Sequence, residues 1–142
     1  GASSERVEAW YRYGVNVGLA FQIQDDFLDT FGESGATGKQ VGGDILSDKK
    51  TLLWLTTEAN EEGRKALAPW VGVHPASGSD QGEAKITAVR AAMVAAGADV
   101  EAQRRMAQHV EEAVSALRTL NLSAETSGWF EGLAQHVVSR SH

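Results

Sequence analysis

A long helical pattern that ends in three carboxylates most constrains the fold of this chain. From Ser4 to Phe31, residues of similar character recur at steps of three or four, which is the spacing of one face of an α-helix. Ser3 or Ser4 can cap the first turn, Glu5 suits it, and Gly32 ends the pattern. The sequence therefore predicts one long helix at the start of the chain.

The acidic end of this helix is electrostatically unfavourable by itself. Asp25 and Asp29 are four residues apart and Asp26 and Asp29 are three apart. Like charges at these spacings cost roughly 0.2–0.5 kcal/mol per pair, and the carbonyl groups of a last helical turn also repel carboxylates. We therefore expect a positive group nearby, and we interpret this turn as part of a functional site.

One stripe of the helix leads into these acids. Its members recur at helical spacing: Tyr11, Gly14, Gly18, Phe21 or Gln22, Asp25 and Asp29. We therefore expect the carboxylates to face the same interior as the apolar residues. Gly14 and Gly18 each cost about 1 kcal/mol against alanine in a helix, which predicts close approach by a neighbouring backbone.

The rest of the chain predicts a glycine-rich loop followed by shorter helices. The loop covers residues 32–49, and a second region, residues 72–82, is typical of a surface linker. Helical patterns begin at Thr51 and cover residues 61–71, 85–96, 99–120 and 123–139. Because nothing alternates at period two for long enough to form a sheet, the sequence predicts an all-α fold of about six helices.

Composition excludes several classes of protein. The net charge of −6 argues against a nucleic-acid partner, and no apolar run is long enough for a membrane span. The absence of cysteine excludes a disulfide framework and a thiolate metal site, and with no leader sequence the cytoplasm is expected. The four histidines, His74, His109, His136 and His142, form no pair at the spacing of metal ligands.

The first residues suggest a piece of a longer protein. The chain opens with Gly1 rather than methionine and enters a strongly periodic helix within its first turns. We therefore expect residues 1–142 to be a segment of a longer chain, although processing would also explain the missing methionine.

Three inward-facing carboxylates suit a hard divalent cation with oxygen ligands, for which Mg²⁺ is the best match. Mg²⁺ commonly binds one or two carboxylates and completes its shell with phosphate oxygens, so Asp25, Asp26 and Asp29 predict a site for an anionic ligand. The loop that follows supplies Lys39 and Lys49, which can reach phosphate as compact cations. Its glycines allow close approach of the backbone.

At these residues the chain resembles the trans-polyprenyl diphosphate synthases, which include the farnesyl and geranylgeranyl diphosphate synthases. Residues 18–29, Gly-Leu-Ala-Phe-Gln-Ile-Gln-Asp-Asp-Phe-Leu-Asp, resemble the second aspartate-rich motif of that family. The pairs Gly38-Lys39, Gly43-Asp44 and Asp48-Lys49 resemble the loop that follows it, and Lys50-Thr51-Leu52-Leu53 resembles the next helix start. The resemblance covers residues 13–51, and an isolated DDxxD would be weak because terpene cyclases also use one.

The resemblance implies prenyl transfer. An allylic diphosphate loses pyrophosphate, isopentenyl diphosphate attacks the allylic cation through its double bond, and a proton leaves. In this assignment Asp25 is the main Mg²⁺ ligand and Asp26 and Asp29 support it. Lys39 and Lys49 bind the allylic diphosphate with Asp44 in the same loop, and Gln22 lies beside the allylic substrate. An extra residue, Gln40, leaves the choice between Lys49 and Lys50 open.

The resemblance also implies that part of the family's active site is missing from residues 1–142. Family members carry a first aspartate-rich motif on an earlier helix, together with basic residues that bind isopentenyl diphosphate. We therefore expect residues 1–142 to be the C-terminal portion of an isoprenoid-synthase-type helical bundle that lacks its N-terminal half, and to be inactive alone. The full-length protein is expected to be a homodimer, while the product chain length cannot be read from these residues.

Simpler interpretations stay open beside this one. Asp44 could tighten the glycine turn, and Gln22 could satisfy a buried backbone group. Lys85, Arg104, Arg105 and Arg140 are predicted to lie on solvated helix faces. Two further functions are possible for the whole chain: a non-catalytic regulatory subunit of a heteromeric prenyl synthase, and a helical module with a structural metal. The retained acids and lysines argue against the first, and their arrangement favours a metal bridged to an anion over a closed cage.

Overall fold

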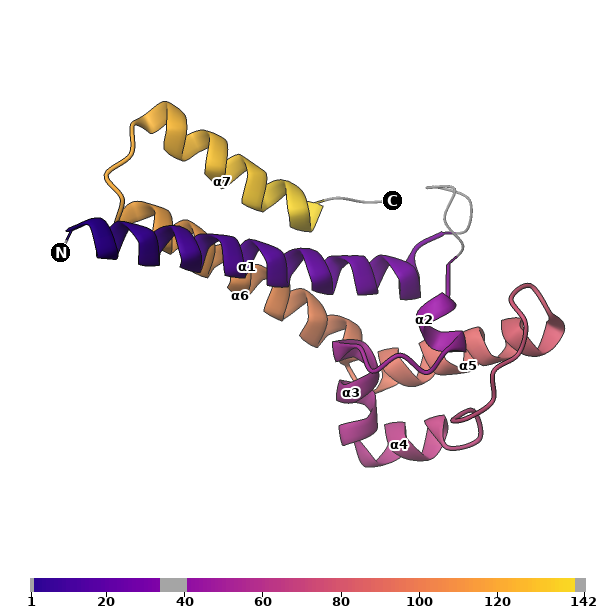
Figure 1. The fold of residues 1–142 in the computed structure, drawn as a ribbon. Coiled ribbons are helices and arrows are strands. Elements are labelled where there is room, and N and C mark those ends of the chain that lie inside the picture. Colours follow the sequence, from indigo (N-terminus) through magenta and orange to yellow (C-terminus); the bar gives the residue numbers. More distant parts are fainter. Residues whose placement is uncertain (1, 34–40, 140–142) are drawn as a thin grey trace. The chain divides into compact units, whose positions relative to one another are not determined.

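The computed structural model describes residues 2–33 and 41–139, and within them the chain contains helices and no strand. The elements are α1 (Ala2–Phe31), α2 (Gly43–Leu46), α3 (Leu52–Ala59), α4 (Glu61–Leu67), α5 (Asp80–Ala95), α6 (Ala98–Arg118) and α7 (Ala124–Ser139) (Figure 1). The predicted all-α fold is therefore confirmed. The described residues contain one element more than the six expected, because the short helix α2 forms inside the predicted loop 32–49.

Side-chain caps explain where several of these helices begin. The Thr51 hydroxyl accepts a hydrogen bond from the N–H of Trp54 at the start of α3, and the Asn60 side chain accepts from Gly63 at the start of α4. The Ser79 hydroxyl accepts from the N–H of Gly82 at 3.0 Å. Because of this cap, α5 begins at Asp80, inside the predicted linker 72–82 rather than after it.

The chain divides into two compact units. The first contains α1 as far as Gln24 together with α6 from Arg104 and α7, and the second contains residues 25–103. Helix α1 thus contributes its long N-terminal part to the first unit and its acidic end to the second. The candidate site residues from Asp25 to Lys49 that the structure describes all belong to the second unit.

The core of the first unit is built from small and aromatic side chains of α1, α6 and α7. Ala9, Tyr13 and Ala20 of α1 pack with buried residues of α6 and α7, such as Ala113 and Ala134. Alanine at these positions allows the helices to approach closely. The hydroxyl of Tyr13 donates to the carbonyl of Phe130 at 2.8 Å, which links α1 to α7.

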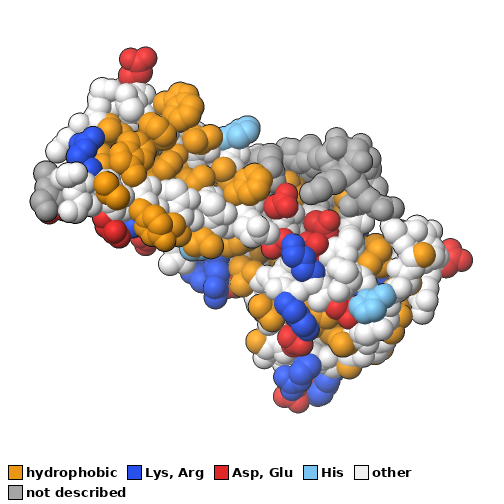
Figure 2. Space-filling model, viewed as in Figure 1, with side chains coloured by type: hydrophobic (Ala, Val, Ile, Leu, Met, Phe, Trp, Pro, Cys, Tyr) orange, Lys and Arg blue, Asp and Glu red, His pale blue; other side chains and the backbone are white. Residues whose placement is uncertain are grey.

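One face of α1 stays exposed in the first unit. Val7, Tyr11, Val15 and Leu19 recur every fourth residue and are 67%, 66%, 40% and 45% exposed. Figure 2 shows apolar side chains gathered over α1 and α7. The predicted close approach at the two helix glycines is wrong for the described residues, since a Cβ at Gly14 or Gly18 would meet nothing within 4 Å.

Helix α5 is the centre of the second unit. It packs against α2, α3 and α4, and its inward face carries Ile86, Val89 and Met93, which are almost fully buried. Helix α3 contributes the buried side chains of Leu53 and Trp54 to this core. Helix α5 therefore supports α2 and, through Lys85, the turn at Asp48 that follows it.

A search of the described helices for a bilayer-spanning segment found none with the required length and apolar content.

Candidate functional site

The three motif aspartates lie in the last two turns of α1. Asp26 is buried, with 9% of its surface exposed, and Asp25 and Asp29 are half-buried. The acids therefore do not project fully into solvent, but the stripe that precedes them does not face an interior, since Tyr11 is 66% and Phe21 is 45% exposed. The prediction that the carboxylates share an inward face with the whole stripe is wrong for the described residues. The last turn of α1 contains no basic residue, so any compensating charge has to come from elsewhere in the chain.

Lys49 supplies the positive charge expected beside the motif. Its ammonium Nζ lies 3.2 Å from Oδ1 of Asp26 and 3.8 Å from Oδ1 of Asp44. The hydrogen bond and charge of Asp26, followed by the charge of Asp44, raise the pKa of Lys49 above its ordinary value. Half of the Lys49 side chain is exposed, so this cation remains accessible to a ligand from solvent.

Asp29 ties the end of α1 to the start of α2. Its Oδ2 accepts a hydrogen bond from the backbone N–H of Asp44 at 2.9 Å, and its carbonyl accepts from the N–H of Gly42 at 2.7 Å. Gly42 has a φ of +95°, which suits glycine and directs the chain back toward α1. The two contacts bring Asp44 to the motif from fifteen residues away.

The resulting cluster carries more negative than positive charge. Burial and the neighbouring charge of Asp29 raise the pKa of Asp44, and Asp26 and Asp25 act in the same direction against the opposing effect of Lys49. Acidic and basic side chains lie together over the end of α1 in Figure 2. A divalent cation would relieve this repulsion, since it prefers carboxylate oxygens.

The donor set fits Mg²⁺ without forming a closed metal cage. Among residues 2–33 and 41–139, no three acidic or histidine side chains are arranged so that they alone could hold a metal ion. Mg²⁺ usually binds through one or two carboxylates, retains water and accepts phosphate oxygens, so an open acidic cluster suits it. Asp25, Asp26 and Asp29 are the residues that would contribute to such a site.

The side chain of Lys50 has different partners from that of Lys49. Its Nζ lies 3.2 Å from Glu58 and 5.1 Å from the centre of the Trp54 ring. The sequence favoured Lys49 without a firm choice over Lys50, and the structure brings Lys49 to the aspartates.

Two basic residues of α5 were missed or misjudged from the sequence. Arg90 donates through Nε to the carbonyl of Thr30 in the last turn of α1, at 2.5 Å, which places a cation at the negative end of that helix. Lys85 was predicted on a solvated helix face, and this is wrong because its side chain is fully buried. The sequence around these two residues did not distinguish them from surface residues, because their hydrogen-bond partners lie 37 and 60 positions away in the chain.

The roles predicted for Lys39 and Gln22 stay predictions. Lys39 lies outside the described residues, as does Gly38 beside it. Gln22 belongs to the first unit, where its side chain is exposed on α1.

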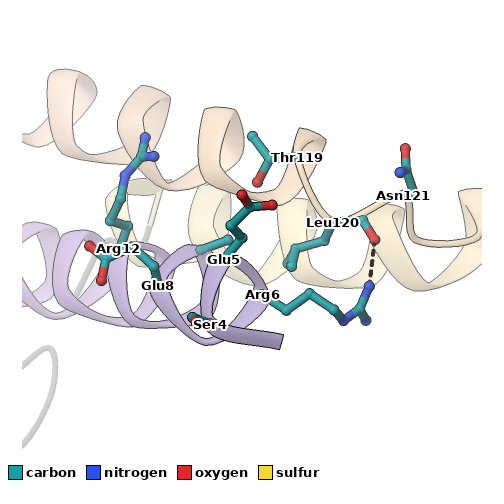
Figure 3. A pocket seen from close by; sticks show the side chains of 9 residues that line it. Ser4, Glu5, Arg6, Glu8, Arg12, Thr119, Leu120 and Asn121 are labelled. Atoms are coloured by element: carbon teal, nitrogen blue, oxygen red, sulfur yellow. Dashed lines mark hydrogen bonds between the residues drawn. The ribbon is translucent and has the colours of Figure 1, made fainter. Parts of the chain in front are cut away.

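A groove in the first unit offers no comparable chemistry. It is lined by Ser4, Glu5, Arg6, Glu8, Ala9, Arg12, Thr119, Leu120 and Asn121 (Figure 3). Arg6 donates to the carbonyl of Leu120 at 3.1 Å, where it binds the chain just after α6. The groove mixes acids and bases without a motif, so the aspartate cluster of the second unit remains the candidate site.

Comparison with known proteins identifies the family to which this chain belongs. The family model described as polyprenyl synthetase matches residues 1–88, which is more than half of the chain. A geranylfarnesyl diphosphate synthase from Natronomonas pharaonis is 32% identical over 100% of this chain and 39% of its own length. A (2E,6E)-farnesyl diphosphate synthase from Mycobacterium bovis is 30% identical over 99% of this chain and 39% of its own length. The chain thus spans about two fifths of the curated relatives that it matches.

Solved structures show the same architecture. A crystal structure of geranylgeranyl pyrophosphate synthase covers 96% of this chain with a TM-score of 0.87 and 29% identity, over 42% of that protein. A geranylgeranyl pyrophosphate synthase from Corynebacterium glutamicum, complexed with isoprenyl diphosphate and magnesium, covers 94% with a TM-score of 0.78 and 30% identity, over 37% of its length. This chain is a member of the polyprenyl synthetase family.

Proposed function

We propose that the complete protein carrying these residues is a Mg²⁺-dependent prenyltransferase that condenses an allylic diphosphate with isopentenyl diphosphate. The observation that carries the proposal is the convergence of Asp26, Asp29, Asp44 and Lys49 at one end of α1. It combines carboxylates for a metal with a cation for a phosphate. Relatives named as prenyl diphosphate synthases, one solved with isoprenyl diphosphate and magnesium, support the substrate class.

The reaction requires charge neutralisation at the leaving group. The allylic C–O bond breaks and pyrophosphate leaves with the electron pair, a C–C bond forms with the double bond of isopentenyl diphosphate, and a proton is released. Mg²⁺ would supply Lewis-acid stabilisation of the departing diphosphate. Asp25, Asp26 and Asp29 would hold the metal, and Lys49 would neutralise the developing charge beside them.

We propose that Asp44 has a positioning role at this site. Its N–H orients Asp29, and its carboxylate lies 3.8 Å from Lys49, so it holds a ligand residue and a phosphate-binding residue together. We also propose that Lys39 binds diphosphate and that Gln22 lies beside the allylic chain. Both assignments rest on the family motif.

We propose that residues 1–142 alone do not turn over substrate. They contain a single Asp-Asp pair, at Asp25-Asp26 in the second aspartate-rich motif, whereas the family reaction also uses the first motif. A homodimer in the cytoplasm is the expected form of the complete protein. The exposed apolar stripe at Val7, Tyr11, Val15 and Leu19 supports a covered surface in that assembly, since large apolar patches mark interfaces.

Thermal unfolding of the complete protein tests the function. The enzyme is expected to gain stability when Mg²⁺ and a non-reactive diphosphate analogue are added together, and much less with either alone, because ligand binding stabilises the folded state. Equal stabilisation by Mg²⁺ alone would favour a structural metal module. Prenyl transfer measured with isopentenyl diphosphate and allylic diphosphates of several lengths then separates a catalytic protein from a regulatory subunit.

A further inference from the structure

Lys85 is the most deeply buried charged residue of the second unit that the structure describes, with no exposed surface. Its ammonium donates to Oδ1 of Asp48 at 2.5 Å, to the carbonyl of Val73 at 2.6 Å and to the carbonyl of Leu46 at 3.4 Å. Three acceptors match the three N–H groups of a lysine. An ammonium withdrawn from water is tolerated only with such partners, so the charge is held in one place.

Asp48 receives this contact in an unusual backbone conformation. Its φ is +55°, a left-handed value that residues other than glycine rarely adopt. The second carboxylate oxygen accepts from the N–H of Gly72 at 2.7 Å. Burial acts to raise the pKa of Asp48, but the hydrogen bonds from Lys85 and Gly72 and the positive charges of Lys85 and His74 outweigh it and hold that pKa below its ordinary value. The carboxylate of Asp48 is therefore tethered to two other segments, at Lys85 and at Gly72.

The left-handed turn at Asp48 lies directly before the cation of the candidate site. The N–H of Asp48 donates to the carbonyl of Ile45 at 3.2 Å, and the N–H of Lys49 donates to the carbonyl of Asp44 at 2.9 Å. These bonds close the turn that follows α2. A change in the φ angle of Asp48 would therefore turn Lys49 away from Asp26.

Helix α5 also supports the other end of this segment. Ile86, next to Lys85, lies so close to Gly42 that a Cβ there would overlap its side chain. Arg90, further along α5, donates to the carbonyl of Thr30 at the end of α1. Helix α5 thus contacts the end of α1 and both ends of the described segment from Gly42 to Asp48.

We propose that Lys85 is a positioning residue of the diphosphate site, because its tether to Asp48 fixes the turn that directs Lys49 toward Asp26 and Asp44. Lys85 touches no substrate in this role and acts through Lys49. The effect on diphosphate binding rests on the proposed function, whereas the effect on the loop does not.

The test compares three variants of the complete protein. Lys85→Met removes the ammonium and keeps the length of the side chain. The double variant Lys85→Met with Asp48→Gly removes both charges and places glycine at the left-handed position, so it folds without a stranded carboxylate. Lys65→Met is the matched control, since Lys65 forms exposed pairs with Glu61 and Glu62.

The rate of backbone amide hydrogen exchange at residues 42–49 reports how strongly this segment is restrained, and it can be measured without enzyme activity. Both Lys85 variants are expected to exchange about tenfold faster there than the wild type and the control, because the tether that restrains the turn is lost. Unchanged exchange in the double variant would overturn the proposal. If the wild type binds no diphosphate with Mg²⁺, the proposed function fails, but the exchange result still decides the role of Lys85 in the loop.

Steady-state kinetics then separates positioning from simple stability. A positioning role predicts that KM for the allylic diphosphate rises about tenfold in both Lys85 variants, while KM for isopentenyl diphosphate stays near its wild-type value. A purely structural role would lower the amount of folded enzyme and leave KM of the folded fraction unchanged. Faster exchange with an unchanged KM would show that Lys85 restrains the loop without serving the site.

Discussion

The Nζ of Lys49 lies 3.2 Å from Oδ1 of Asp26, so the residue that closes the loop contacts the second aspartate of the motif across 23 positions of sequence. The positive charge of Lys49 offsets the repulsion at the end of α1, where acidic side chains lie at the negative end of the helix dipole. Asp26 is buried and Lys49 is half exposed, so the pair keeps its cation available to an anionic ligand.

Replacing Lys49 by methionine in the complete protein is expected to raise KM for the allylic diphosphate about ten- to hundredfold, because a charged hydrogen bond to the ligand contributes about 1.5–3 kcal/mol. Lys50→Met is the matched control, since that lysine pairs with Glu58 over Trp54. Steady-state kinetics of both variants checks the assignment. A larger effect from Lys50 would reverse the choice that the geometry favours.

Asp25→Ala is expected to lower turnover by several orders of magnitude, because this residue is proposed as the main Mg²⁺ ligand and metal-assisted departure of pyrophosphate depends on it. The measurement is single-turnover prenyl transfer at saturating Mg²⁺. Removing a half-buried carboxylate from the surface of α1 is expected to change thermal unfolding far less than activity. Turnover close to the wild-type value would exclude Asp25 from catalysis.

Asp48→Asn is expected to destabilise the protein at neutral pH by about 3 kcal/mol, because it leaves the buried ammonium of Lys85 without its counter-charge. The pKa of Asp48 is lowered from its ordinary value of 3.8. Its ionised form therefore stabilises the fold above about pH 3.8, and this contribution is lost as the pH falls through the lowered pKa.

The difference in unfolding free energy between wild type and Asp48→Asn should consequently shrink below that pH. Denaturant unfolding from neutral pH into the acid range measures it. A difference that stays constant throughout the acid range would show that the ionisation of Asp48 does not contribute.

Gly42→Ala is expected to destabilise the second unit by about 1–2 kcal/mol, because its φ of +95° is unfavourable for any residue with a Cβ. Gly14→Ala is the opposite case, since Gly14 lies in α1 with open space around it and should gain up to about 1 kcal/mol from helix propensity. Urea unfolding of both variants compares the two effects. Equal stability of the two would contradict the left-handed requirement at Gly42.

Helix type and motif could be predicted from the sequence because they depend on neighbours within a turn or two. The pattern from Ser4 to Phe31 requires only the periodicity of its own residues, and the observed α1 ends at the predicted Phe31 before Gly32. The aspartates and the lysines that follow them carried the family resemblance, which the comparisons confirm.

The choice among chemically equivalent residues was decided by tertiary structure. Lys49 and Lys50 are adjacent and identical in type, and only their contacts with Asp26 and Glu58 distinguish them. Lys85 has the sequence context of a solvated residue, yet it is buried against Asp48 from 37 positions away. Helical spacing encodes which residues share a face, but the burial of a charge depends on acceptors that the folded chain brings from distant segments. For that reason the sequence alone determined the helices and the acidic motif, whereas the tertiary structure decided that Lys49 lies beside the aspartates and that Lys85 is buried against Asp48.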